Sequence, residues 1–173
     1  MEKVLLEAIV EALRGVTAPR FFRSERGYHG RLYCTLQEAL DRRGILKDGL
    51  ILEMEYQKGA RHRMTQRPDI ILHVPAEESM AAVHENNVAV LALKRRASRD
   101  DALEDFAKLD EMCGILGYLL AVFVNVDSRD HHLQHYAGPF GDRLHGFAVR
   151  PDDGALRVRH AWRDHDTLRE SEE

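Results

Sequence analysis

Two successive segments that have the composition of β-strands carry an acidic residue and a lysine. Asp69 follows Pro68 at the start of the first segment, and Lys94 lies near the end of the second, residues 88–95. Carboxylates bind hard divalent cations, and a nearby ammonium group can stabilise the negative charge that develops on a phosphate. This pair of residue types therefore indicates metal-assisted attack on a phosphodiester.

The spacing of these residues resembles the pattern of the PD-(D/E)xK, or restriction-endonuclease-like, nuclease superfamily. Pro68 and Asp69 match the PD of that pattern, and Lys94 matches its final lysine. Residue 92 shares a strand face with Lys94 and would be acidic in the family, but this chain has Ala92 there. The resemblance implies hydrolysis of a nucleic acid, with DNA the favoured substrate and Mg²⁺ or Mn²⁺ as cofactor.

The resemblance also implies which groups would surround the ion. Asp69 is the main metal ligand, the backbone carbonyl of Leu93 is a further contact, and Glu25 matches the acid that such sites take from the first core helix. Lys94 would stand beside the attacking water or the scissile phosphate. The predicted catalytic set is Asp69, Lys94, Glu25 and the position of Ala92. Each side chain taken alone also fits an ordinary structural role, and only the combination favours a site.

The alanine at position 92 leaves three interpretations open. Loss of the family's glutamate would leave a nuclease that binds its substrate without cleaving it. A natural pseudo-nuclease that kept the fold for binding is the second interpretation. In the third, the carboxylate has moved to another element, and the acids nearest in the predicted arrangement are Glu53, Glu55, Glu104 and Asp105. An ordinary solvated surface is the simpler explanation for these four acids.

Positive charge gathers on both sides of the predicted site, although the net charge of the chain is −4. Nucleic-acid binding depends on the local distribution of charge more than on the sum. Residues 56–68 contain no acid, and a second basic cluster ends the following strand. The predicted phosphate contacts are Lys58, Arg61, Arg63, Arg67, Arg95 and Arg96. Simple solvation of these side chains is the alternative.

Hydrophobic periodicity and capping residues predict the elements that must hold these side chains. Apolar residues recur at helical spacing in residues 2–15 and 24–43, where Ser24 can cap the helix, and a third helix begins at Ser98 or Asp100. The predicted strands are residues 50–56, 68–74, 88–95, 118–126, 144–149 and 155–161, with a turn at 151–154. The fold class is α/β, and the resemblance implies a restriction-endonuclease-like α-β-β-β-α-β core with a mixed central sheet flanked by helices.

Length and composition fit a single domain, because 173 residues with 44% hydrophobic content can bury one full core. We expect one nuclease-like domain in residues 1–162 and a polar, frayed tail in residues 163–173. Cys34 and Cys113 lack metal-ligand spacing and fit reduced thiols. His131 and His135 lie one helical turn apart, but the further ligands of a zinc site are missing nearby, so we expect a polar surface turn.

The apolar runs are too short to span a bilayer, so we expect a cytoplasmic protein without a membrane partner. Cutting both strands of a duplex with one site per chain would require a homodimer. A different class of function stays open, namely an inactive nuclease-fold module that binds nucleic acid or regulates. Salt-sensitive binding is expected of both, but only the enzyme would show metal-dependent turnover.

Overall fold

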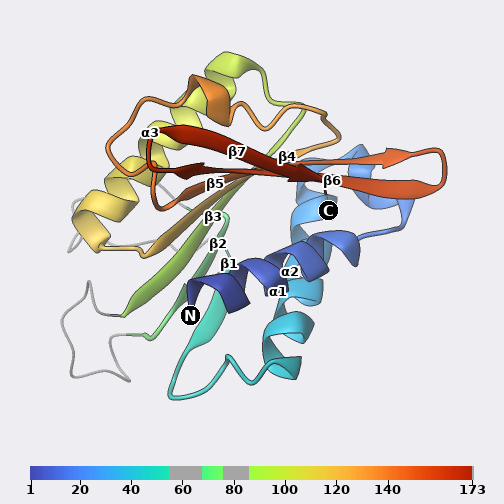
Figure 1. The fold of residues 1–173 in the computed structure, drawn as a ribbon. Coiled ribbons are helices and arrows are strands. Elements are labelled where there is room, and N and C mark those ends of the chain that lie inside the picture. The colour runs from blue at the N-terminus through green and yellow to red at the C-terminus, as the bar shows by residue number, and fades with distance from the viewer. Residues whose placement is uncertain (55–67, 76–85, 173) are drawn as a thin grey trace.

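A single sheet of seven strands runs through the residues that the structure, a computed structural model, describes: 1–54, 68–75 and 86–172 (Figure 1). The strands lie side by side in the order in which they occur in the sequence. Their bounds are β1 Ile51–Met54, β2 Ile70–His73, β3 Asn87–Arg95, β4 Leu120–Val126, β5 Leu144–Asp152, β6 Ala155–Asp164 and β7 Thr167–Glu172.

The sheet is mixed, with parallel strands at its centre. β3, β4 and β5 run parallel, whereas the pairs on either side are antiparallel. Parallel neighbours need a crossover, and α3 (Arg99–Leu116) provides it between β3 and β4. The β5–β6 connection is a two-residue hairpin turn in which Asp153 and Gly154 have φ values of 45° and 84°. Positive φ at both positions is typical of a type I′ turn, and the turn predicted at residues 151–154 is confirmed.

The three predicted helices are present among the described residues as α1 (Glu2–Arg14), α2 (Glu25–Arg42) and α3. Ser24 caps α2, because its Oγ accepts a hydrogen bond of 3.1 Å from the N–H of Gly27. Ser98 caps α3 in a reciprocal capping box with Asp101. Two short 3₁₀ helices, η1 (Pro19–Arg23) and η5 (Leu133–His135), lie in the connections. No helix in the described part of the chain is long and apolar enough to cross a membrane.

The helices form layers on the two faces of the sheet (Figure 1). α1 and α2 pack together on one face and share a core cluster with β3 residues such as Leu91 and Leu93. α3 covers the other face, where its apolar residues pack against Val90 and Phe123. All seven residues of β4 are buried, as predicted for a central strand. The α/β class with a mixed sheet flanked by helices is therefore confirmed.

The C-terminal residues form a strand where the sequence predicts a frayed tail. Thr167–Glu172 pairs with β6 as the edge strand β7, so the prediction of a tail over residues 163–173 does not hold for this stretch. Arg157 and Arg159 of β6 form ion pairs of 2.6 and 2.8 Å with glutamates of β7. Cross-strand pairs of opposite charge stabilise a solvated edge strand without much apolar burial, which is why the hydrophobic pattern misses it.

The segment from His131 to His135 is more buried than predicted. His131 is 2% exposed and its Nε2 lies 3.2 Å from Oε1 of Glu170, whereas His135 is exposed. Leu133 belongs to the core on the α3 face and draws this turn inward. A polar surface turn is therefore wrong for His131 and correct for His135.

Two further buried histidines join β5 to β6. Nδ1 of His145 lies 2.9 Å from Nε2 of His160, and the His160 ring stacks on Phe147 with the ring centroids 4.3 Å apart. Burial, and secondarily the charge of His160, lowers the pKa of His145 from 6.5 to about 3. The folded protein therefore keeps His145 neutral at pH values where the unfolded chain binds a proton.

Acidification is expected to destabilise the fold through His145. Between pH 6.5 and about 3 the unfolded chain takes up a proton at this residue and the folded chain does not, so unfolding becomes more favourable as the pH falls. One such group lowers the free energy of unfolding by up to about 1.4 kcal/mol per pH unit. Urea unfolding between pH 7 and 4 should show a smaller pH slope for His145→Gln than for the wild type. The exposed His135→Gln should keep the wild-type slope, and an unchanged slope in His145→Gln would contradict the prediction.

Candidate active site

The predicted site residues meet at one end of the β2–β3 pair, around a pocket of about 170 Å³. The pocket is lined from four directions: the start of α2, the start of β2, the end of β3, and α3. All four predicted catalytic positions line it, and α3 adds two further charged side chains. The lining residues that matter for chemistry are Glu25, Asp69, Ala92, Lys94, Asp105 and Lys108.

Asp69 lies where the pairing of β2 with β3 stops. The ladder begins with Ile70 opposite Leu91, and Pro68 has no N–H with which to extend it. Oδ2 of Asp69 accepts a hydrogen bond of 2.6 Å from the N–H of Leu93 in place of a further ladder bond. In a strand the carbonyl of a residue points to the same side as its N–H, so the Leu93 carbonyl faces this opening as well.

The surroundings of Asp69 disfavour its negative charge. Burial is the largest cause and raises the pKa of the Asp69 carboxyl group. The hydrogen bond from Leu93 and the charge of His29 lower this pKa, and the negative charges of Glu25 and Asp105 raise it again. His29 also donates from Nε2 to the backbone carbonyl of Asp69 at 2.8 Å, which fixes the strand entrance. A cation among these carboxylates would relieve their mutual repulsion.

Asp105 brings a carboxylate to the pocket beside Ala92. Ala92 and Lys94 share a face of β3, and Ala92 packs in the core cluster on the α3 face. Asp105 of α3 is only 7% exposed, and its Oδ1 accepts a hydrogen bond of 2.7 Å from Nζ of Lys108. An ordinary solvated position, the simpler explanation from the sequence, is therefore wrong for Asp105.

The other acids considered as replacements do not reach the pocket or lie outside the described residues. Glu104 is exposed on α3. Oε2 of Glu53 lies 2.6 Å from Nε2 of His73, within the β1–β2 pair. Glu55 lies outside the described residues. Of the candidate acids that the structure describes, Asp105 is the one that lines the pocket.

Glu25 and Lys94 close the pocket from two sides. Glu25 opens α2, and its Oε2 accepts a hydrogen bond of 2.8 Å from the backbone N–H of Arg95. This bond ties the start of α2 to the end of β3 and explains how an acid so distant in sequence reaches the site. Lys94 is half-buried in the pocket wall, and its ammonium group forms no hydrogen bond or ion pair within the described residues.

Arg95 and Arg96, predicted to contact phosphates, have partners within the protein. Arg95 donates from Nε to the carbonyl of Phe22 at 2.7 Å and from a terminal nitrogen to Asp127 at 3.0 Å. Nε of Arg96 lies 2.8 Å from the same Asp127 oxygen, although the Arg96 side chain is 63% exposed. Arg95 is therefore a structural brace. The other predicted contacts, Lys58, Arg61, Arg63 and Arg67, lie outside the described residues.

The sequence gives no role to Lys108 or His29, which help to build this site. Both follow from helical spacing, because Lys108 comes three residues after Asp105 and His29 four residues after Glu25. Residues at these separations share one side of a helix. Once an acid is assigned to the site, its helical neighbours at these spacings are the residues to inspect.

The oxygen-rich lining suits a hard divalent cation in the kind of ligand it offers. Asp69, Asp105 and Glu25 provide carboxylates and Leu93 a carbonyl, the ligand types that Mg²⁺ and Mn²⁺ prefer. Each carboxylate already accepts a hydrogen bond. Across residues 1–54, 68–75 and 86–172, no three His, Cys, Asp or Glu side chains are grouped so that they could hold a metal ion. Metal binding would therefore require side-chain movement, chiefly the release of Asp105 from Lys108.

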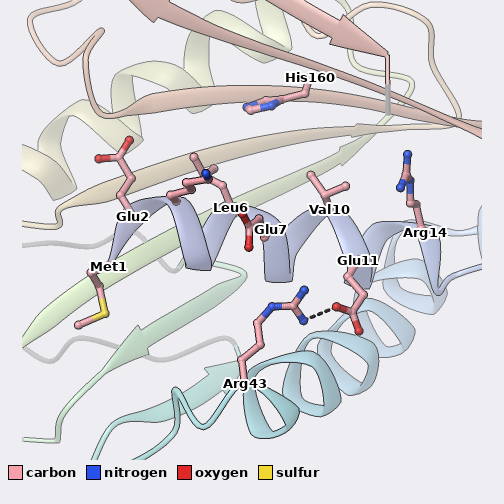
Figure 2. A pocket seen from close by; sticks show the side chains of 10 residues that line it. Met1, Glu2, Leu6, Glu7, Val10, Glu11, Arg14, Arg43 and His160 are labelled. Atoms are coloured by element: carbon pink, nitrogen blue, oxygen red, sulfur yellow. Dashed lines mark hydrogen bonds and ion pairs between the residues drawn. The ribbon is translucent and has the colours of Figure 1, made fainter.

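A larger pocket lies elsewhere, along α1. It has a volume of about 900 Å³, and side chains of α1 and His160 of β6 line it, with the Glu11–Arg43 ion pair at its side (Figure 2). Its lining includes both apolar side chains, such as Leu6 and Val10, and charged ones, such as Glu7. None of the predicted site residues lines this pocket, so its size does not identify the chemistry.

Substitution of the Arg95 side chain, which links β3 to η1, is expected to destabilise the protein more than substitution of the Arg96 side chain. Arg95→Met loses the charged hydrogen bond to the Phe22 carbonyl, which at a partly exposed site costs about 1 to 2 kcal/mol of unfolding free energy. Arg96→Met loses an exposed ion pair and should cost less than about 0.5 kcal/mol. Urea unfolding with a common m-value checks both, and equal losses would mean that Arg95 does not brace η1.

Comparison of the chain with protein-family models, with curated proteins and with solved structures finds no significant match.

Proposed function

We propose that this protein is a restriction-endonuclease-like nuclease that hydrolyses phosphodiester bonds of nucleic acid, with DNA the favoured substrate and Mg²⁺ or Mn²⁺ as cofactor. The observation that carries the proposal is the position of Asp105, which is buried in the pocket that Asp69, Glu25 and Lys94 also line. Asp105 supplies the second metal-binding carboxylate, which residue 92 supplies in the family pattern. Ala92 therefore does not abolish activity.

The carboxylates of Asp69 and Asp105 would hold the ion, with Glu25 and the Leu93 carbonyl as further oxygen ligands. When bound, the ion lowers the pKa of an attacking water and neutralises charge on the phosphate. Lys94 stabilises the negative charge that builds on the phosphate during attack. Lys108 neutralises the charge of Asp105 through their ion pair of 2.7 Å, which Asp105 would have to give up in order to bind the ion. Cutting both strands of a duplex with this single site would use a homodimer.

A second candidate function is an inactive module that binds nucleic acid or regulates. Two observations favour it: Asp105 is paired with Lys108, and no group of three metal-binding side chains is assembled within the described residues. In such a module the ammonium of Lys108 would take the place of the ion and keep the acids neutralised. Turnover in the presence of a divalent ion separates the two candidates.

Cleavage should depend on Asp105 as well as on Asp69. Labelled single- and double-stranded DNA and RNA would be incubated with Mg²⁺, Mn²⁺ or EDTA and resolved on denaturing gels. We expect cleavage by the wild type with metal only. Because each substitution removes a ligand charge, Asp69→Asn and Asp105→Asn should each lower the rate on the order of 100-fold or more.

Glu104→Gln is the matched control, since it removes an exposed acid from the same helix and should leave the rate unchanged. Adding Ala92→Glu to Asp105→Asn should restore part of the activity by returning a carboxylate to the pocket from β3. Activity that appears only when glutamate occupies position 92 in the otherwise wild-type chain would mean a disabled nuclease. Salt-sensitive binding with no cleavage by any variant would favour the inactive module.

Metal binding should be visible without any substrate, as stabilisation of the fold. At an Mn²⁺ concentration about tenfold above the dissociation constant, the Tm should rise by roughly 3 to 6 °C. A variant carrying both Asp69→Asn and Asp105→Asn should lose this rise, whereas Glu104→Gln should keep it. Differential scanning calorimetry measures both, and an equal rise in the doubly neutralised variant would place the ion elsewhere.

A further inference from the structure

Three arginines lie together at the junction of η1 and α2, next to the candidate active site. Arg20 and Arg23 belong to η1, Arg26 belongs to the first turn of α2, and all three are exposed. Residues three apart in a 3₁₀ helix lie on one side of it, with a separation of about 6 Å along the axis. Arg20 and Arg23 are therefore close enough to contact the same phosphate group or adjacent ones.

This junction is fixed against the strand that carries Lys94. Phe22 is buried and packs edge-to-face on Tyr28, with the ring centroids 5.0 Å apart. Arg95, directly after Lys94, donates to the Phe22 carbonyl through its side chain and to Glu25 through its backbone N–H. The arginines thus stand on elements that are fixed against β3, and Arg23 and Arg26 lie within two residues of Glu25, which lines the pocket.

No acidic side chain is paired with Arg20, Arg23 or Arg26 within the described residues. Glu25 is the single acid in residues 17–37, and it already accepts the Arg95 N–H. The guanidinium groups of Arg23 and Arg26 form no hydrogen bond or ion pair with the part of the chain that the structure describes, and that of Arg20 lies over the Phe21 ring, 4.8 Å from its centroid. By contrast, Arg157 and Arg159 of β6 are paired with glutamates.

The positions of these arginines are not explained by helix stability. The N-terminal end of a helix carries partial positive charge, so cations there are unfavourable and acids favourable. Ser24 and Glu25 follow that rule at the start of α2, whereas Arg23 and Arg26 on either side of them break it. Unpaired guanidinium groups at an unfavourable place point to a negatively charged partner outside the chain.

We infer that Arg20, Arg23 and Arg26 form a binding surface for the sugar–phosphate backbone of nucleic acid. The planar guanidinium fork donates to phosphate oxygens, and contacts of this kind fix the register of a strand without reading its sequence. The surface adjoins the pocket lined by Lys94 and Asp69, so a strand held on it runs past the proposed cleavage site. The inference rests on the proposed function for its substrate class, but the binding itself needs no metal.

The test compares two triple variants that remove the same charge. Arg20→Gln, Arg23→Gln and Arg26→Gln are combined in one, and Arg42→Gln, Arg129→Gln and Arg169→Gln, exposed residues from other parts of the chain, in the control. Fluorescence anisotropy in EDTA measures binding to a labelled 20-base-pair DNA duplex and to single-stranded DNA and RNA of the same sequence, from about 50 to 200 mM salt. Circular dichroism and thermal unfolding verify that both variants fold.

The first variant should bind at least about tenfold more weakly than the wild type, and the control less than about threefold. For duplex DNA, the slope of log K against log salt should flatten by about 2 to 3 in the first variant, because each lost phosphate contact removes about 0.9. Equal weakening in both variants would overturn the inference, as would a wild type that binds none of the three probes.

Failure of this surface and failure of the proposed hydrolysis are distinguishable. Binding that depends on the three arginines but is followed by no cleavage in Mg²⁺ or Mn²⁺ would retain the surface and reject the nuclease activity. Metal-dependent cleavage and binding that both survive the triple substitution would retain the nuclease activity and reject the surface.

Discussion

The hydrogen bond from the N–H of Leu93 to the carboxylate of Asp69 sets the geometry of the candidate site. The β2–β3 ladder stops before Pro68, which has no N–H to donate to the Leu93 carbonyl, and the Asp69 carboxylate is the acceptor for the Leu93 N–H in this partly buried place. The same bond holds Asp69 against β3 at the point where pairing stops. The pocket is enclosed by the starts of β2 and α2, the end of β3 and one side of α3. Glu25, Lys94 and Asp105 therefore all lie around the place where this bond joins β2 to β3.

The buried negative charge of Asp69 opposes folding. Burial and the charges of neighbouring acids disfavour the negative charge of Asp69. The Leu93 N–H and His29 partly offset this effect at Asp69. Lys108 and the Arg95 N–H donate to the carboxylates of Asp105 and Glu25. Such a cluster contributes little to stability compared with apolar residues of similar size. An acid whose pKa is raised by burial in a cleft, as that of Asp69 is, is more typical of functional sites than of structural cores.

Much of the fold follows from local patterns, whereas the remaining features depend on contacts between distant segments. Helix periodicity, Ser24 and Ser98 as caps, and turn residues define most elements within a few positions. The resemblance selects Glu25, Asp69 and Lys94 by their order in the sequence, and the structure brings all three to one pocket, while their catalytic role stays a prediction. The choice between Asp105 and Glu104 could not be made, since it depends on how α3 is rotated against the sheet. Asp105 lies on the buried face of α3 together with Leu109 and Met112, which follow it by four and seven residues. The ion pair of Arg95 with Asp127 and the ion pairs of β7 could not be predicted either, because they join residues that are distant in the sequence.

The packing of α1 has a consequence for how the chain folds as it is synthesised. α1 contacts α2, which follows almost at once, and also β6, which begins only at residue 155. At usual translation rates the wait between these two partners is on the order of 10 s, far longer than helix formation itself. Leu5, Ile9 and Leu13 are buried in the finished protein but lack part of their cover until then. Between the synthesis of α2 and that of β6, the α1–α2 pair therefore lacks the β6 part of its packing, and transiently exposed apolar surface of this kind is prone to aggregation.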